Sequence, residues 1–261
     1  MKKIKAKIID NRKIPAGFYK MRVRSVYLAK NTRPGQFFEV RCPDGSGTFL
    51  RRPLGAHRIN KTGVEMLYEV AGKGTKALSG MKAGQELDII GPLGNGFDVP
   101  KTKGSRPTTI LVAGGIGVAP LVALAESLGR RGKVTAIIGA RKKSHVLCES
   151  DMKKAGAKVL VATEDGSKGV KGLVTEVLVK ALITTKDQRL ATIYACGPTG
   201  MLKAVAGIAA KYNIACQVSM EEHMACGVGV CLGCPVKMKK TGAYKMVCKD
   251  GPVFDAKGIA W

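Results

Sequence analysis

The sequence has 261 residues, of which 45% are hydrophobic and 24% are charged, with a formal net charge of +25. This composition excludes a wholly disordered chain, and the length favours two domains at about 150 residues each. The charge is spread, with +11 in residues 1–100 and +12 in residues 101–215, which indicates a lysine-rich surface. An acidic partner and nucleic acid remain alternative explanations of that charge.

Residues 1–100 predict an antiparallel β-barrel. Short strand-like segments at residues 37–40, 64–70 and 86–90 are separated by Gly, Pro and Asn turns. Residues 64–70 partly alternate between apolar and polar side chains, as a half-buried strand does. Several short strands with turns between them favour a small closed sheet.

Residues 101–215 predict a doubly wound parallel α/β domain, because strand signals alternate with helical spacing. The strand signals lie at residues 110–112, 134–138, 159–162, 191–194 and 216–219, and the helical segments at residues 120–128, 173–182 and 201–211. Residues 107–125 carry no charge and are long enough for a membrane span. Their glycines and Pro120 favour a strand, a turn and a helix start instead, so we expect no membrane segment.

Residues 216–261 hold five of the eight cysteines and little periodicity, so we expect a small metal-bearing subdomain. A basic start without an apolar segment argues against secretion, and clustered thiols then indicate a reducing, cytoplasmic location. The remaining thiols, Cys42, Cys148 and Cys216, are predicted to be small buried side chains.

Cys226, Cys231, Cys234 and Cys248 follow the C-x4-C-x2-C…C spacing of plant-type 2Fe-2S proteins. Four thiolates balance the charge of two ferric ions, and the intervening glycines let the backbone wrap closely around the sulfurs. A structural zinc site and unmetallated thiols are the alternatives, because Cys231 and Cys234 also form a C-x2-C pair.

Two glycine-containing loops follow predicted strands of the α/β domain. Their residues are Gly114, Gly115, Gly117 and Pro120 in the first loop, and Cys196, Gly197 and Pro198 in the second. The first departs from G-x-G-x-x-G because proline takes the last position, yet its glycines still let the backbone approach a pyrophosphate. Cys196 is either a neighbour of a nicotinamide or another buried thiol. Glu164 and Asp165 either bind ribose or form a solvated turn.

Two motifs of the barrel region suggest a diphosphate site. Arg51 and Arg52 supply guanidinium groups, and residues 72–75 form a glycine-rich turn that could hold a phosphate. A surface arginine pair and a hairpin turn explain the same residues equally well.

Taken in order, these motifs resemble the ferredoxin-reductase flavoprotein superfamily, and more narrowly the electron-transfer subunits of NAD-linked, two-subunit dihydroorotate dehydrogenases. The similarity covers nearly the whole chain and is most specific at residues 219–234 and 247–255. It implies FAD on a barrel at residues 1–100, a nicotinamide cofactor on residues 101–215, and a 2Fe-2S cluster on residues 216–261.

The resemblance also assigns residues to each cofactor. The implied FAD contacts are Arg52, Pro53, Leu54, Gly55, Tyr68, Glu69, Val70, Gly74 and Thr75. The two glycine loops would hold NAD, and the four cysteines of the C-x4-C-x2-C…C motif would bind the cluster. One departure stands out, because the family usually has Ser or Thr, with a hydroxyl near the flavin, at the position of Gly55.

The implied function is electron transfer in pyrimidine biosynthesis. A catalytic partner carrying FMN would oxidise dihydroorotate, and electrons would pass singly through the cluster to FAD, which gives a hydride to NAD⁺. We expect a heterotetramer with two copies of each subunit, and no general acid or base in this chain.

Two other functions compete with this one. The first is the small FAD/2Fe-2S subunit of a ferredoxin:NADP oxidoreductase or sulfide dehydrogenase, and Arg141, Lys142 and Lys143 keep NADP open as the cofactor. The second is a zinc-containing nucleic-acid-binding protein, against which the low aromatic content of 5% and the glycine loops count.

Overall fold

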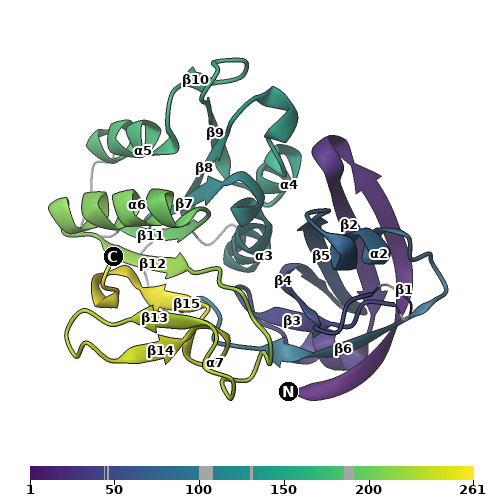
Figure 1. Cartoon of the computed structure of the whole chain (residues 1–261). Helices are drawn as coiled ribbons and strands as arrows, with labels where there is room; N and C mark the ends of the chain where they lie inside the picture. The colour runs from purple at the N-terminus through teal and green to yellow at the C-terminus, as the bar shows by residue number, and fades with distance from the viewer. Residues whose placement is uncertain (44, 46, 100–107, 130–131, 185–190) are drawn as a thin grey trace.

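The computed structural model describes residues 1–43, 45, 47–99, 108–129, 132–184 and 191–261. These residues form a closed six-stranded barrel, a seven-stranded sheet with helices on both faces, and a two-stranded sheet (Figure 1). No helix in this part of the chain has the length and apolar character that a membrane crossing requires.

The barrel has the strand order β1-β2-β5-β4-β3-β6, and its neighbouring strands are antiparallel. Its elements are β1 (Lys2–Ile14), β2 (Phe18–Arg24), α1 (Val26–Asn31), β3 (Phe37–Val40), β4 (Arg52–Asn60), β5 (Gly63–Glu69), α2 (Lys73–Ser79) and β6 (Glu86–Leu93). The predicted barrel is therefore confirmed, with β3, β5 and β6 at the expected residues. An apolar core that includes Met21, Met66 and Ile89 fills it.

Strand β5 is buried on both faces, so the prediction of a half-buried strand is wrong. Its residues from Gly63 to Tyr68 are all buried. Val64 and Met66 point into the barrel core, whereas Leu67 packs with the core of the parallel domain. The alternation is incomplete because a second domain covers the outer face of this strand.

The seven-stranded sheet has the order β10-β9-β8-β7-β11-β12-β15. Its strands are β7 (Thr108–Gly114), β8 (Lys133–Ala140), β9 (Lys158–Thr163), β10 (Val170–Lys171), β11 (Ala191–Cys196), β12 (Ala215–Ser219) and β15 (Val253–Asp255). All neighbours are parallel except β15, which pairs antiparallel with β12. The predicted parallel sheet is confirmed, and an antiparallel edge strand extends it.

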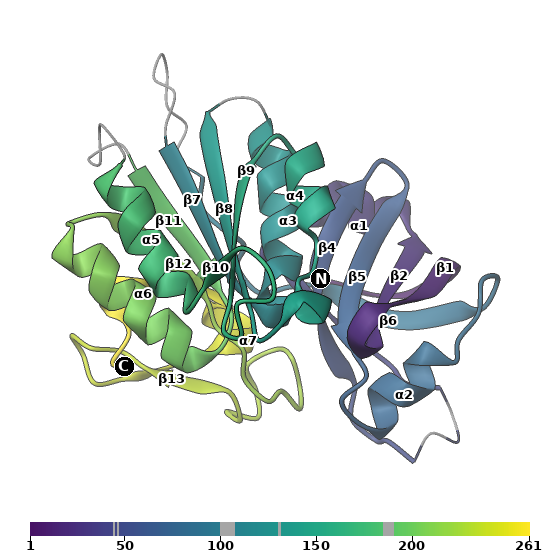
Figure 2. The ribbon, with the colours of Figure 1, turned by 90° about the horizontal axis from the view of Figure 1, so that it is seen from above.

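Helices cover both faces of this sheet (Figure 2). On the side of the barrel lie α3 (Val118–Leu128) and α4 (Glu149–Lys154), and on the other side lie α5 (Val174–Ile183) and α6 (Thr199–Lys211). Helix α3 is buried nearly all round because it contacts β7 and β11 on one side and β4 of the barrel on the other. Because α3 is buried on both sides within the protein, packing between the two domains accounts for the long uncharged stretch, and no membrane is needed to explain it.

The last part of the chain packs beneath the sheet (Figure 1). It contains β13 (Pro235–Lys237), β14 (Tyr244–Met246), α7 (Val247–Asp250) and the edge strand β15. Val236, Val247 and Phe254 belong to the same apolar cluster as Ile193 and Val218 of the parallel strands. The segment therefore shares its core with the parallel domain. The predicted boundary between residues 215 and 216 falls inside the strand β12.

Candidate cofactor sites

A cleft of about 610 Å³ lies between the barrel and the parallel domain. One wall comes from β4, β5 and the start of α2, and the opposite wall comes from the start of α3 and the end of β11. Residues 219–224, which begin at the last residue of β12, form a third wall. The cleft thus lies at the carboxyl ends of parallel strands, where open α/β sheets bind ligands.

Half of the residues predicted to hold FAD or NAD line this cleft. They are Pro53, Leu54, Gly55, Tyr68, Glu69, Thr75, Pro120 and Cys196. The others lie beside it in the same loops and strands, namely Arg52, Val70, Gly74, Gly114, Gly115, Gly117, Gly197 and Pro198. The structure therefore brings residues from distant parts of the sequence to one cleft.

Gly55 faces open space in the cleft. A Cβ atom at this position would meet no heavy atom within 4 Å. A serine or threonine hydroxyl would therefore fit here, so packing of the protein does not explain the glycine.

Tyr68 is held rigidly at the base of the cleft. Its hydroxyl donates a hydrogen bond to Asn11 Oδ1 at 3.0 Å, and Asn11 Nδ2 donates to the carbonyl oxygens of Leu78 and Met81. The ring stacks on Tyr19 with centroids 5.8 Å apart. Burial raises the pKa of the Tyr68 phenol, which therefore stays neutral and acts as a fixed donor to Asn11.

Arg52 lies against the glycine-rich segment, as the diphosphate hypothesis requires. A Cβ atom on Gly74 would come within 2.7 Å of Arg52 Nε. Thr75 Oγ1 accepts hydrogen bonds from the backbone N–H groups of Ala71 and Gly72 and so caps the first turn of α2. The alternative of a hairpin turn is wrong, because this segment begins a helix.

The alternative of a surface arginine pair is also wrong. Arg51 forms an ion pair with Asp88 at 2.9 Å and donates to the backbone carbonyl of Asp88 at 3.1 Å. Arg51 is thus tied to β6, which leaves Arg52 as the guanidinium available to an anion at the start of α2.

The two glycine loops pack directly against each other. A Cβ atom on Gly117 would overlap the carbonyl group of Cys196, and one on Gly114 would lie 2.8 Å from Pro198 Cδ. A Cβ atom on Gly197 would lie 2.9 Å from the Gly114 nitrogen. Close loop packing therefore accounts for three of the glycines. Gly115 has a φ of 55° and open space around its Cβ position.

Cys196 is a buried thiol, as one of the two interpretations of the sequence held, and it also lines the cleft. It ends β11, and burial raises its pKa, with a further contribution from Glu221. The thiol is therefore protonated at neutral pH and unsuited to nucleophilic attack.

Sequence reasoning missed the third wall of the cleft. It consists of Ser219, Met220, Glu221, Glu222, His223 and Met224. The sequence did contain a signal for this wall. The segment leads from the end of β12 to Cys226, the first cysteine of the cluster motif, and therefore has to pass the carboxyl edge of the sheet.

The four clustered cysteines lie in two pairs. Cys226 contacts Cys231, and Cys234 contacts Cys248 through their side chains. Cys226 Sγ accepts backbone N–H groups from Val228 at 3.4 Å and from Cys231 at 3.5 Å. Burial opposes ionisation, but these hydrogen bonds outweigh it and lower the pKa of Cys226 to about 6.

This paired arrangement suits two iron ions better than one zinc ion. Tetrahedral zinc needs its ligand atoms around a single point. Among the described residues, three such atoms come within 4.8 Å of one another at His57, Cys148 and Asp151, and not at the clustered cysteines. Two thiolate pairs are what a 2Fe-2S cluster requires, since each iron takes two protein ligands.

One end of the cysteine loop reaches the surface. Cys231 is exposed between Val230 and Leu232, whose side chains are 78% and 65% exposed. Cys234 and Cys248 are buried. The group bound here would therefore be accessible from one side only.

Glu39 is a second feature that sequence reasoning missed. It lies on β3, is 1% exposed, and neither carboxylate oxygen has a hydrogen-bond partner among the described residues. A Cβ atom on Gly227 would overlap its side chain, so Glu39 packs behind the cysteine loop. Burial raises the pKa of Glu39 to about 7, although Arg51 opposes the shift.

The remaining candidate residues are the other three cysteines and the acidic pair Glu164 and Asp165. Cys42 and Cys216 are buried, as predicted, whereas Cys148 is partly exposed. Asp165 Oδ1 accepts hydrogen bonds from the backbone N–H and the hydroxyl of Ser167, which forms a turn. Asp165 therefore lies in a turn, as the solvated-turn alternative for the acidic pair predicted.

Residues 221–260 match the family model described as the iron-sulfur cluster binding domain of dihydroorotate dehydrogenase B, and residues 111–207 match the oxidoreductase NAD-binding domain. The chain is 40% identical to the dihydroorotate dehydrogenase B (NAD(+)) electron transfer subunit of Caldanaerobacter subterraneus, covering 98% of each chain. It is 39% identical to that of Fusobacterium nucleatum, covering 96% of this chain and 95% of the relative.

Solved structures show the same architecture. A chain of the NADH-dependent reduced ferredoxin-NADP oxidoreductase, studied for flavin-based electron bifurcation, has a TM-score of 0.85 at 30% identity. The match covers 98% of this chain and 90% of that one. A ferredoxin reductase of carbazole 1,9a-dioxygenase has a TM-score of 0.68 at 21% identity over 82% of this chain and 66% of that one, which shows the fold alone.

Proposed function

Because this chain belongs to the family of electron-transfer subunits of NAD-linked dihydroorotate dehydrogenase, we propose that it carries electrons between a catalytic partner subunit and NAD. One observation supports this most directly. Residues 219–224 form a wall of the cleft, and the chain then continues into the loop of Cys226, Cys231 and Cys234. A cofactor in the cleft and a cluster on the cysteines would thus be neighbours.

FAD would lie on the barrel side of the cleft. Arg52 and Gly74 supply a guanidinium beside a helix start, which suits the diphosphate. The flavin ring would contact Pro53, Leu54, Gly55, Tyr68, Glu69, Val70 and Thr75. The phenol of Tyr68 is fixed by its hydrogen bond to Asn11, so its oxygen can accept a further hydrogen bond but not donate one. The open space at Gly55 leaves this edge of the ring to water or backbone.

NAD would approach from the parallel domain. Its pyrophosphate would lie near the two packed loops, formed by Gly114, Gly115, Gly117 and Pro120 and by Cys196, Gly197 and Pro198. Pro120 and Cys196 border the same cleft as Gly55, so a nicotinamide placed there would reach the flavin.

The chain supplies placement and electrostatics, and the cofactors supply the chemistry. When bound, FAD exchanges an electron pair with nicotinamide, and a 2Fe-2S cluster carries electrons singly. Backbone N–H groups directed at Cys226 stabilise a thiolate and its bound metal. Burial raises the pKa of Glu39 to about 7, which lowers the negative charge that its carboxylate places near the thiolates.

The catalytic partner would dock where the cysteine loop reaches the surface. Val230, Cys231 and Leu232 present an exposed apolar surface, which suits burial against another subunit. We propose an FMN-containing dihydroorotate dehydrogenase subunit at this position, two copies of each subunit, and a cytoplasmic complex that serves pyrimidine biosynthesis.

Cofactor content tests the site assignment. Anaerobically purified chain is expected to show flavin absorbance, about two irons per chain, and an EPR signal on reduction. Cys231→Ser is expected to lower the iron content at least tenfold, whereas Cys216→Ser, a buried thiol outside the loop, is expected to retain it. Colourless protein that contains one zinc per chain would contradict the proposal.

A ferredoxin:NADP oxidoreductase subunit is the second candidate, because the structure with a TM-score of 0.85 comes from such an enzyme. The exposed Arg141, Lys142 and Lys143 after β8 could hold a 2′-phosphate. Anaerobic reduction of the bound flavin separates the candidates. We expect NADH to reduce it at least tenfold faster than NADPH, and the reverse order would favour the second candidate.

A further inference from the structure

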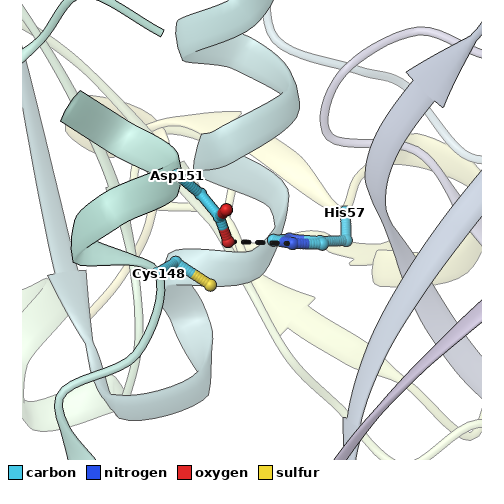
Figure 3. A group of neighbouring side chains, drawn as sticks. All are labelled: His57, Cys148 and Asp151. Carbon is cyan, nitrogen blue, oxygen red and sulfur yellow. Dashed lines mark ion pairs between the residues drawn. The ribbon is translucent and has the colours of Figure 1, made fainter. Parts of the chain in front are cut away.

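A group of buried and half-buried polar side chains joins the barrel to the parallel domain (Figure 3). It contains His57 on β4, Glu65 on β5, Cys148 just before α4, and Asp151 in α4. The ligand atoms of His57, Cys148 and Asp151 lie within 4.8 Å of one another. None of these residues lines the cleft.

The tautomer of His57 follows from its neighbours. Its Nδ1 lies 3.1 Å from the carbonyl oxygen of Ala119. A carbonyl only accepts hydrogen bonds, so Nδ1 carries the proton and a neutral ring presents a lone pair at Nε2. His57 is 0% exposed, and Nε2 has no hydrogen-bond partner among the described residues.

Nε2 faces two carboxylate oxygens. Glu65 Oε1 lies 3.5 Å away and Asp151 Oδ2 lies 3.9 Å away. Glu65 Oε1 also lacks a hydrogen-bond partner in the described part of the chain. Asp151 Oδ2 is paired with Lys20, whereas His57 Nε2 and Glu65 Oε1 are facing acceptors that need a hydrogen or a cation beside them.

The ring of His57 is already in the tautomer that a metal ligand requires, with its proton on Nδ1 and a lone pair on Nε2 that is free among the described residues. A metal ion meets the need for a cation beside Nε2, because metal-binding histidines usually donate their other N–H to a carbonyl or carboxylate, as His57 does to Ala119.

We propose that His57, Cys148 and Asp151 form a zinc site that ties the barrel to the parallel domain, with a water molecule as the fourth ligand. One imidazole nitrogen, one sulfur, one carboxylate oxygen and one water oxygen form a mixed donor set that tetrahedral zinc accepts. On binding, the Cys148 thiol releases its proton to solvent, and the thiolate sulfur bonds to the metal.

The neighbouring cations Lys20 and Arg58 do not use all the lone pairs of Asp151. Lys20 Nζ donates to Asp151 Oδ2 at 2.6 Å and Arg58 Nη2 donates to Oδ1 at 3.2 Å. Each carboxylate oxygen has a further lone pair, so Asp151 can still coordinate a metal.

The charges of the group also favour a divalent cation. Three carboxylates, those of Glu65, Asp151 and Glu126, face two cations, Lys20 and Arg58. The sum is one negative charge while the thiol is protonated. A divalent ion that displaces the thiol proton brings the sum to zero.

Metal counting tests the site in the full chain loaded with iron. After anaerobic equilibrium dialysis against zinc chloride, we expect one zinc per chain with the iron content unchanged. Cys148→Ser is expected to weaken zinc binding at least tenfold, because the site loses its sulfur ligand. Cys216→Ser, at a buried thiol of the other core cluster, is expected to bind zinc as the unmodified chain does.

X-ray absorption at the zinc edge needs no variant and tests the ligand set directly. One sulfur at about 2.3 Å and three nitrogen or oxygen ligands at about 2.0–2.2 Å are expected. Four sulfur ligands would place the zinc on the cysteine loop and overturn the proposal. Uptake of no zinc, or uptake that Cys148→Ser leaves unchanged, would also overturn it.

Discussion

Glycines of this protein serve two purposes, and the space around each Cβ position separates them. At Gly117 a side chain would overlap the backbone of Cys196, so this glycine permits the contact between two loops. At Gly55 a side chain would enter an open part of the cleft. The fold thus requires a glycine at position 117. At position 55 a side chain would change only the space that the cleft offers to a ligand.

Gly55→Ser is therefore expected to change the free energy of unfolding by less than about 0.5 kcal/mol and to retain FAD. Gly117→Ala serves as the matched control and is expected to cost about 1–3 kcal/mol, because the methyl group forces the loops apart. Urea unfolding with flavin quantification measures both. Equal losses of stability in the two variants would contradict this distinction.

The buried thiol of Cys216 provides a second prediction at this scale. Burial, and then Asp255, raise its pKa to about 12, so the thiolate is roughly one part in ten thousand at pH 8. We expect iodoacetamide to leave Cys216 unmodified in folded protein and to label it once urea unfolds the chain. Mass spectrometry measures the labelling of Cys216. If Cys216 in the folded protein reacted as fast as free glutathione does, the thiol would be accessible and the prediction would be wrong.

At the scale of elements, the edge strand β15 connects the cysteine segment to the parallel sheet. Val218 of β12 pairs with Phe254 of β15, and Phe254 also packs against Gly251, three residues after Cys248. Loss of the strand is therefore expected to disturb the cysteine loop as well as the sheet.

Phe254→Ala is expected to cost about 3–5 kcal/mol of unfolding free energy and to lower the iron content, because it leaves a cavity beside the loop. Leu173→Ala removes a side chain that is 55% exposed and is expected to change stability by less than about 0.5 kcal/mol. Urea unfolding and iron analysis measure these effects. An iron content that falls equally in both variants would argue against a role for β15.

Several of the elements were predictable from local patterns, and others were not. The parallel strands β7, β8, β9, β11 and β12 and the helices α3, α5 and α6 were found because each has a clear apolar pattern, whereas the two-residue strand β10 is too short to show one. The strands β1, β2 and β4 were missed because their polar residues obscure the alternation, as in the lysine-rich β1. The burial of the outer face of β5 and the position of Glu39 depend on packing between segments far apart in the chain. A local sequence pattern does not contain this information.

At the scale of the whole molecule, the two cofactor domains are joined by a polar contact as well as by the apolar packing of α3. Lys20 of the barrel pairs with Asp151 of α4, and the two side chains are only 10% and 16% exposed. Arg58 reaches both Asp151 and Glu126. These ion pairs tie β2 and β4 of the barrel to α3 and α4 of the parallel domain.

Lys20→Met is expected to destabilise the protein by about 3 kcal/mol, because it leaves buried carboxylates without their nearest cation. Lys153→Met removes a cation that is 60% exposed in its pair with Glu149 and is expected to cost about 0.5 kcal/mol or less. Chemical unfolding of both variants measures the difference. Similar small losses would mean that the contact between the domains is apolar alone.

The proposed function depends most on which partner subunit this chain binds and on the direction in which electrons flow between that partner and NAD. Affinity purification of the chain from its own cells, followed by an assay of NADH formation with dihydroorotate and NAD⁺, tests it most directly. We expect an FMN-containing partner and NADH formation that depends on dihydroorotate and is lost with Cys231→Ser. Recovery of a partner without FMN, in a complex that reduces ferredoxin or NADP⁺ and leaves dihydroorotate unchanged, would contradict it.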